Sequence, residues 1–187
     1  MTFLPFSRWS GSWEQKILLG ILVAAIPMIV CGAALAQPAP PPDGRVGHFD
    51  QGIPVYWPYH AILMSAGFVL LFSGFMVARF HKTGNWYKTH RLLETTGAAC
   101  IIFGLFIGVY MVALSGFPHL RNIHEVLGAI AGIVLIATLA LGYSITRAGK
   151  SGKVVRKSHR WLGRTTLVLI AINIALGVFF LSMILRR

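Results

Sequence analysis

Acidic residues are scarce in this sequence, which has five Asp and Glu residues against 17 Lys and Arg residues in a chain of 187. Cysteine is almost absent, since Cys31 and Cys100 are the only two and both lie in apolar stretches. Two such thiols give no basis for a disulfide framework, and apolar cysteines are usually packing residues. The apolar stretches are also too long and unbroken for the strands of a membrane β-barrel, which are shorter and alternate in polarity.

What the sequence has in excess is apolar residues and positive charge. Hydrophobic residues make up 56% of the chain, which is typical of a membrane protein rather than a soluble domain. The formal net charge of +12 comes mostly from Lys and Arg in short loops between apolar spans, where the positive-inside rule places them. No stretch offers a solvated basic face for reading a groove, so we expect no nucleic-acid partner.

The N-terminal part of the chain divides into two segments before the main apolar core. Within residues 1–36, the apolar run ends in Ala34-Leu35-Ala36, the small-x-small pattern of a signal-peptidase site. Cleavable signal peptide and retained signal anchor both remain open. Residues 37–57 are rich in proline and are expected to form an extended segment on the outer side of the membrane.

Four further apolar spans follow in residues 58–185, which we interpret as one domain. The spans cover about residues 58–80, 86–114, 118–143 and 165–185. Because lipid cannot satisfy a free backbone, each span must be helical. The predicted fold is therefore an all-α integral membrane protein, with a four-helix transmembrane bundle plus one N-terminal hydrophobic helix. Its place would be the plasma or inner membrane, and the chain would cross it several times.

Each of the four spans is associated with a histidine, and the histidines fall into two motif classes. Lys88 and Lys157 begin the pattern K-[ST]-H-R-x-L, whereas the other two spans share H-x-[IV]-L. Neighbouring spans run antiparallel, so the histidines of alternate spans share a membrane level. This topology predicts two pairs, His60 with His124 on the outer side and His90 with His159 on the inner side. The two motif classes select the same pairs.

Two pairs of imidazoles at two depths suit two six-coordinate irons. Imidazole is a common axial ligand of haem iron, and helical bundles usually build cofactor sites from side chains on facing helices. A zinc or copper site would want three or four ligands in one sphere. We therefore predict two b-type haems, one bound by His60 and His124 and the other by His90 and His159.

Small residues follow the histidines at helical spacing. Gly67 and Gly74 lie about two and about four helical turns after His60, and Gly97 and Gly104 repeat these spacings after His90. These positions share a helix face, so they would leave room for a flat cofactor. The alternative is close packing of transmembrane helices, for which small residues are the usual requirement.

Several polar residues near the histidines are further candidates. Some basic residues lie near the histidines and would pair with haem propionates, or would only anchor the chain by the charge rule. They are Lys88, Arg91, Arg160 and Arg164 on the inner side of the membrane and Arg121 on the outer side. Glu94, one turn after His90, is an acceptor for an imidazole N–H, a proton carrier or a partner of a nearby arginine. We expect Asn173 to form a hydrogen bond within the bundle.

These motifs resemble the cytochrome b561 family over about residues 57–181. The residues that carry the resemblance are His60-Ala-Ile-Leu-Met64, Trp86 to Arg91, His124 to Gly128, His159 to Arg164 and Ile172 to Gly177. The closest form is the domain that follows a DOMON haem- or sugar-binding domain. The resemblance implies a dihaem b-type protein that moves electrons across a membrane. The chain contains no DOMON domain and has one C-terminal helix fewer than six-helix members, so the outer partner and the inner donor cannot simply be carried over.

The predicted function is transmembrane electron transfer between a reductant, ascorbate or quinol, on the cytoplasmic side and an acceptor on the outer side, or in the reverse direction. The acceptor implied by the family is a ferric chelate or a secreted redox protein. Whether the chain is itself an enzyme, of ferric-reductase or of quinol/ascorbate-oxidising type, stays open. One alternative is a haem-bearing membrane anchor that serves a larger redox complex and has no substrate of its own. Another is a haem-free scaffold with interfacial histidines. A homodimer and a redox-protein partner also remain open.

Overall fold

The computed structural model describes residues 56–81, 84–114, 119–145 and 152–186, and these form four α-helices. The helices are α2 (Trp57–Phe80), α3 (Trp86–Leu114), α4 (Ile123–Ile145) and α5 (Gly152–Leu185). The predicted all-α bundle is thus confirmed for this part of the chain. The expected N-terminal hydrophobic helix and nearly all of the proline-rich segment lie outside the described residues.

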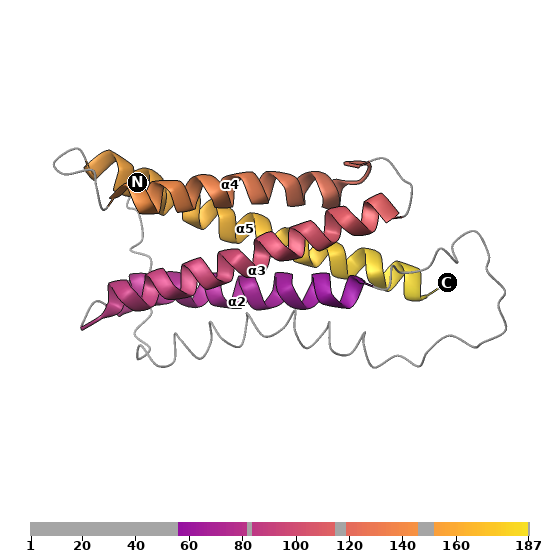
Figure 1. The fold of residues 1–187 in the computed structure, drawn as a ribbon, viewed down its shortest axis with the longest axis horizontal. Helices are drawn as coiled ribbons and strands as arrows, with labels where there is room; N and C mark the ends of the chain where they lie inside the picture. Colours follow the sequence, from indigo (N-terminus) through magenta and orange to yellow (C-terminus); the bar gives the residue numbers. More distant parts are fainter. Residues whose placement is uncertain (1–55, 82–83, 115–118, 146–151, 187) are drawn as a thin grey trace, which may run out of the picture.

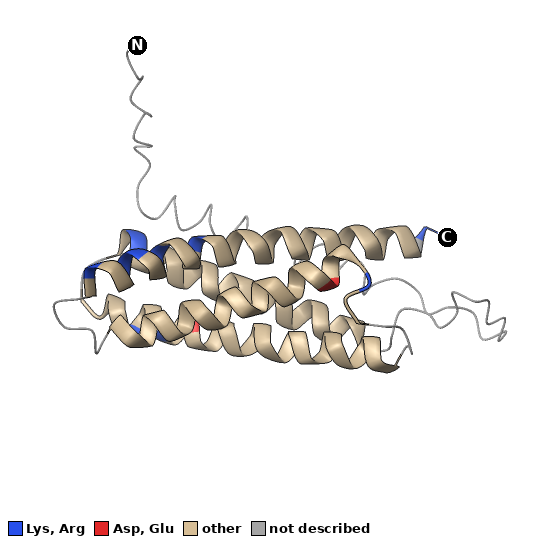
Figure 2. Cartoon of the chain, turned by 90° about the horizontal axis from the view of Figure 1, so that it is seen from above, with Lys and Arg blue, Asp and Glu red and all other residues tan. Residues whose placement is uncertain are grey.

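All four helices are long and apolar enough to cross a membrane. Large apolar side chains point away from the bundle, as a lipid environment requires: Phe103 is 63% exposed, Phe106 67% and Ile133 68%. The described Lys and Arg residues gather mainly at the end where α3 and α5 begin (Figure 2). The chain is therefore a multi-pass integral membrane protein, and by the positive-inside rule we call this basic end the inner end.

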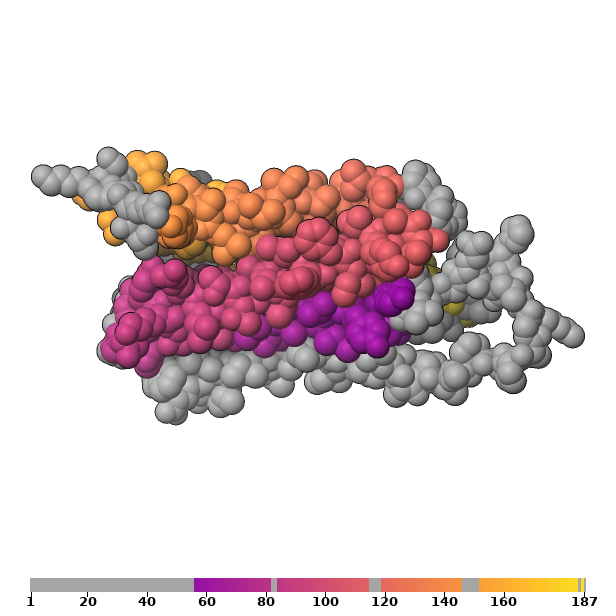
Figure 3. All heavy atoms as spheres, in the orientation of Figure 1, coloured from indigo at the N-terminus to yellow at the C-terminus, as the bar shows by residue number. Residues whose placement is uncertain are grey.

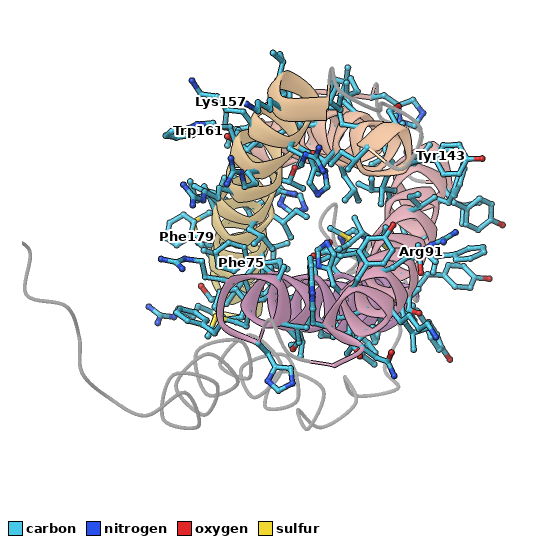
Figure 4. The ribbon with its side chains drawn as sticks, turned by 90° about the vertical axis from the view of Figure 1, so that its left-hand side faces the viewer. Phe75, Arg91, Tyr143, Lys157, Trp161 and Phe179 are labelled. Atoms are coloured by element: carbon cyan, nitrogen blue, oxygen red, sulfur yellow. The ribbon has the colours of Figure 1, made fainter. Side chains whose placement is uncertain are left out.

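The bundle consists of two antiparallel hairpins, α2 with α3 and α4 with α5 (Figure 1). Most packing lies within each hairpin, and the two hairpins meet over fewer residues. Seen from the inner end, α2 lies diagonally opposite α4, and α3 lies opposite α5 (Figure 4). The buried side chains at the centre come from all four helices: Met64, Phe68, Leu71, Ala98, Ile101, Ala131, Leu135 and Ile170.

Two glycines allow α2 and α3 to touch through their backbones. A Cβ on Gly67 would lie 2.8 Å from the carbonyl oxygen of Gly97, and a Cβ on Gly97 would lie 2.9 Å from that of Gly67. Small residues bring transmembrane helices together in this way. The expectation that these two glycines leave room for a flat cofactor is therefore wrong, since their open side is filled by the neighbouring helix.

Two helices begin at different residues from those expected. The third span was predicted from residue 118, but α4 begins at Ile123 because Leu120 has a left-handed φ of 61°. Asn122 then caps the helix, accepting a 3.0 Å hydrogen bond from the backbone N–H of Glu125.

The fourth span was predicted from residue 165, whereas α5 begins at Gly152. Its 34 residues measure about 51 Å at 1.5 Å each, well beyond a hydrocarbon core of about 30 Å. The first turns of α5 therefore extend past the membrane core and carry the basic motif around His159 on a continuous helix.

In the space-filling view, α3 and α4 cover one face of the bundle above α2 (Figure 3).

Candidate functional site

The structure brings the four histidines of the spans together as two pairs. The rings of His60 on α2 and His124 on α4 have centroids 6.2 Å apart and planes at 78°. The rings of His90 on α3 and His159 on α5 have centroids 6.4 Å apart and planes at 81°. Each pair joins diagonally opposite helices, one from each hairpin. We call His60 and His124 the outer pair, and His90 and His159 the inner pair.

Every one of these imidazoles is held by a backbone carbonyl of the other helix in its hairpin. Within α2 and α3, His60 Nδ1 lies 2.7 Å from the carbonyl oxygen of Gly104, and His90 Nδ1 lies 3.0 Å from that of Gly74. A carbonyl oxygen only accepts hydrogen bonds, so Nδ1 carries the hydrogen and donates in both cases. In the neutral imidazole, Nε2 is then unprotonated, with its lone pair available to a metal.

The second hairpin repeats this arrangement. His124 Nδ1 donates to the carbonyl oxygen of Asn173 at 3.1 Å, and His159 Nδ1 donates to that of Thr138 at 3.0 Å. The four acceptors occupy equivalent positions, since each follows the histidine of its own helix at one common spacing. This spacing is about four helical turns, or about 21 Å of rise. The outer and inner pairs are therefore separated by roughly this distance along the bundle.

Three further glycines give the rings room to approach. A Cβ would lie 3.2 Å from His60 Cε1 if placed on Gly108, and 3.0 Å from His124 Cε1 if placed on Gly177. On Gly142 it would lie 3.0 Å from His159 Cε1. Each glycine is one turn after the carbonyl that the same ring contacts, so it clears the path to that oxygen.

Sequence reasoning did not assign this role to the three glycines. The pattern that would have found them is a small residue about five helical turns after each histidine, on the same helix. Gly108, Gly142 and Gly177 follow this spacing on their helices, and Ala78 takes the position on α2. Because the spacing completes a whole number of turns, the histidine and the small residue face the same direction.

The side-chain oxygen of Asn173 does not form the hydrogen bond that we expected within the bundle. Its side chain is buried, yet Oδ1 has no hydrogen-bond partner among the described residues. The expected bond within the bundle is made instead by the backbone carbonyl, which accepts from His124. A nearby polar contact joins the hydroxyls of Thr138 and Thr166 at 3.1 Å.

The two pairs fit the axial positions of haem iron. A metal–imidazole bond is about 2.0 Å long, and a ring centroid lies about 1 Å behind its nitrogen, so two rings on opposite sides of one metal have centroids about 6 Å apart. Both pairs match this spacing. Within the described residues no three His, Cys, Asp or Glu side chains form a common metal-binding group. A six-coordinate iron in a porphyrin needs two ligands from the protein, and each pair supplies two imidazoles.

The basic candidates all lie on the outside of the bundle. Lys88, Arg91 and Arg160 are exposed at the inner end, where α3 and α5 begin, and Arg121 is exposed at the opposite end, just before α4. Arg164 is also exposed, and its guanidinium lies 5.6 Å from the centre of the Trp161 ring. Trp161 projects outward from α5 (Figure 4). The structure thus places these side chains around the sites rather than between the imidazoles.

Comparison with known proteins identifies one family. A family model described as eukaryotic cytochrome b561 matches residues 59–184, which include all four paired histidines. No curated protein and no solved structure matches the chain.

Proposed function

Because this chain belongs to the cytochrome b561 family, whose members carry electrons across membranes with b-type haem, we propose that it does so through two haems. The outer pair, His60 and His124, binds one haem, and the inner pair, His90 and His159, binds the other. When bound, haem supplies the one-electron iron couple. The spacing of the imidazoles within each pair carries the proposal.

The protein's own part is to orient ligands and to hold the two sites in register. The Nδ1–H bonds to carbonyls fix each ring and leave Nε2 free of the backbone as the metal-binding nitrogen. These acceptors belong to rigid helix backbone rather than to mobile side chains, so the rings are preorganised. The separation of about 21 Å along the helices spans most of the hydrocarbon core, and the breadth of two porphyrins would shorten the gap that electrons cross.

The inner end suits an anionic reductant. Lys88, Arg91 and Arg160 are exposed around the inner pair, and such a cluster raises the local concentration of anions. Ascorbate is the donor that we propose, with membrane quinol as the alternative. The acceptor would approach the outer pair from the other side as a ferric chelate or a redox protein. The basic side chains, together with Arg121 and Arg164, are also proposed to pair with haem propionates.

The test is haem content in purified variants. The wild-type protein should hold two low-spin b-type haems per chain, and His60→Ala or His159→Ala should each remove about one. The double variant His60→Ala/His124→Ala should lose no more haem than either single variant, because both residues serve one site. His81→Ala, a change at an exposed histidine outside the pairs, should keep both haems.

Protein without low-spin haem bands would refute the proposal, as would a double variant that loses both haems.

A second experiment, electron transfer in liposomes, distinguishes a self-sufficient electron carrier from a membrane anchor. We expect ascorbate on the inner side to reduce a ferric chelate on the other side. Stoichiometric copurification of a soluble partner, with no transfer by the chain alone, would favour the anchor function.

A further inference from the structure

The first turns of α5 carry a stripe of basic side chains along one side of the helix. From Lys153, basic residues recur three, four, seven and eleven positions later, which is the spacing of a single helix face. The members of this basic stripe are Lys153, Arg156, Lys157, Arg160 and Arg164, and all five are exposed. The positive-inside rule asks for basic residues near the end of a span, but it does not ask that they share a face.

The basic stripe continues directly into the apolar outer surface of α5. Lys157 and Trp161 project away from the bundle on the same side as Phe179 (Figure 4). Between Trp161 and Phe179, the exposed side chains of Val168 and Ile172 lie on this face at helical spacing. The outer face of α5 is therefore basic in its first turns and apolar along the rest of its length.

The change from basic to apolar falls at the inner boundary of the membrane. Trp161 and Phe179 are separated by about 27 Å of helix rise, close to the hydrocarbon thickness of about 30 Å. Tryptophan favours such a boundary, and the Arg164 guanidinium lies 5.6 Å from the centre of the Trp161 ring. Lys157, one turn beyond Trp161, and Lys153, a further turn on, therefore lie at the level of the lipid headgroups and just beyond it.

The described part of the chain places no carboxylate against the basic stripe. Residues 126–187 contain no Asp or Glu, so α5 has no acidic residue and α4 has none after its first turn. Glu94, the acidic residue of α3, packs instead on Gly74 of α2, where a Cβ would lie 2.8 Å from its Oε1. The negative charge that complements the stripe must therefore come from another molecule.

We propose that Lys153, Lys157 and Trp161 bind the headgroup of an anionic phospholipid in the inner leaflet, with an acyl chain along Val168 and Ile172. Basic clusters directly inside a transmembrane helix attract anionic lipids, and long basic side chains reach phosphates from the boundary while their stems stay in apolar surroundings. A free phosphate or an acidic soluble protein would use the charges alone. Only a lipid uses the charges and the adjoining apolar surface together.

A lipid bound here would support, from outside, the turns of α5 that hold His159. Support from inside is loose at this point, since a Cβ on Gly163, one turn after His159, would meet only Thr138 Cγ2 at 3.7 Å. We therefore expect anionic lipid to raise the melting temperature of the protein. The inference does not depend on haem, because the lipid lies on the face of α5 that points away from the histidine pairs.

The experiment is native mass spectrometry of the full chain in detergent, titrated with phosphatidylglycerol and, in parallel, with phosphatidylcholine. Wild-type protein should retain one phosphatidylglycerol in preference to phosphatidylcholine. Lys153→Gln/Lys157→Gln, which changes no proposed haem partner, should weaken phosphatidylglycerol binding at least tenfold and leave phosphatidylcholine binding unchanged. Lys88→Gln/Arg91→Gln removes the same charge at the same end of the bundle, but on α3. This control should keep the preference for phosphatidylglycerol.

Thermal unfolding gives a second measurement and checks that each variant folds. All proteins should melt alike in phosphatidylcholine, and phosphatidylglycerol should raise the melting temperature of the wild type and the control but not of Lys153→Gln/Lys157→Gln. Equal affinity of the wild type for both lipids would overturn the inference, as would equal weakening in the two double variants, which would indicate net charge alone. Displacement of the lipid by glycerol phosphate, which lacks acyl chains, or by a copurifying acidic protein would also overturn it. None of these results would affect the proposed function.

Discussion

The imidazole of His60 donates a 2.7 Å hydrogen bond to the carbonyl of Gly104, and Gly104 lies on the same face of α3 as His90, about four helical turns further along. His90 in turn donates to Gly74, which follows His60 on α2 at the same spacing. Each helix of the hairpin thus holds the other's histidine. Because both bonds depend on one helix–helix register, a shift of α3 along α2 would disturb the outer and inner sites together.

Gly97→Ala tests this shared register. The new Cβ would lie 2.9 Å from the carbonyl oxygen of Gly67, so the two backbones must separate. We expect a loss of about 1–3 kcal/mol in stability, the usual cost of overpacking, and a lower content of both haems. Thermal unfolding in detergent and haem per chain are the measurements. Gly163→Ala is the control, since its Cβ would meet only Thr138 Cγ2 at 3.7 Å. An unchanged melting temperature in Gly97→Ala would contradict the prediction.

Gly177→Ala should affect one site only. Its Cβ would lie 3.0 Å from His124 Cε1 and would push this ring away from the carbonyl of Asn173. We expect the outer haem to bind about 10–100-fold more weakly, as for other changes that disturb the support of a metal ligand. Haem titration into the apo-protein measures the effect, and Gly163→Ala on the same helix is again the control. Equal weakening of the inner haem would argue against a local cause.

Asn173→Leu should be tolerated. The side-chain oxygen of Asn173 is buried without a partner among the described residues, and an unsatisfied polar group of this kind costs roughly 1–3 kcal/mol. The backbone carbonyl that holds His124 remains in the variant. Unfolding measurements should therefore show equal or greater stability, with both haems retained. Asn173→Asp, which adds a buried charge, should be clearly destabilising; loss of the outer haem in Asn173→Leu would show that the amide has a ligand-binding role.

Reduction by an anionic donor should depend on salt. Lys88, Arg91 and Arg160 are exposed at the inner end, and charge attraction at such a surface is screened as the Debye length falls from about 30 Å at 0.01 M to about 3 Å at 1 M salt. Stopped-flow reduction by ascorbate should slow with rising salt. The dependence should flatten in Lys88→Ala/Arg91→Ala. A neutral quinol should show little salt effect, and an equally steep response for both reductants would contradict electrostatic attraction.

The sequence alone determined the class of fold and the pairing of the histidines. Long apolar spans must be helices, because lipid offers no partner to a free backbone, and four antiparallel crossings leave His60 at the level of His124 and His90 at the level of His159. The structure brings these rings together as two pairs. Glu94 was also singled out from the sequence, since a carboxyl one turn after a histidine is rare at membrane depth.

Tertiary structure decided which atoms hold the rings and what the glycines do. Helical periodicity gives the face on which a residue lies, but not the neighbour that this face meets, because the rotation and axial position of each helix depend on packing with the others. Gly97 therefore contacts the backbone of α2, although its spacing from His90 suggested room for a cofactor. The carbonyl of Gly104 became a histidine acceptor for the same reason: a backbone oxygen carries no sequence signature, and only the register of two packed helices brings it to His60.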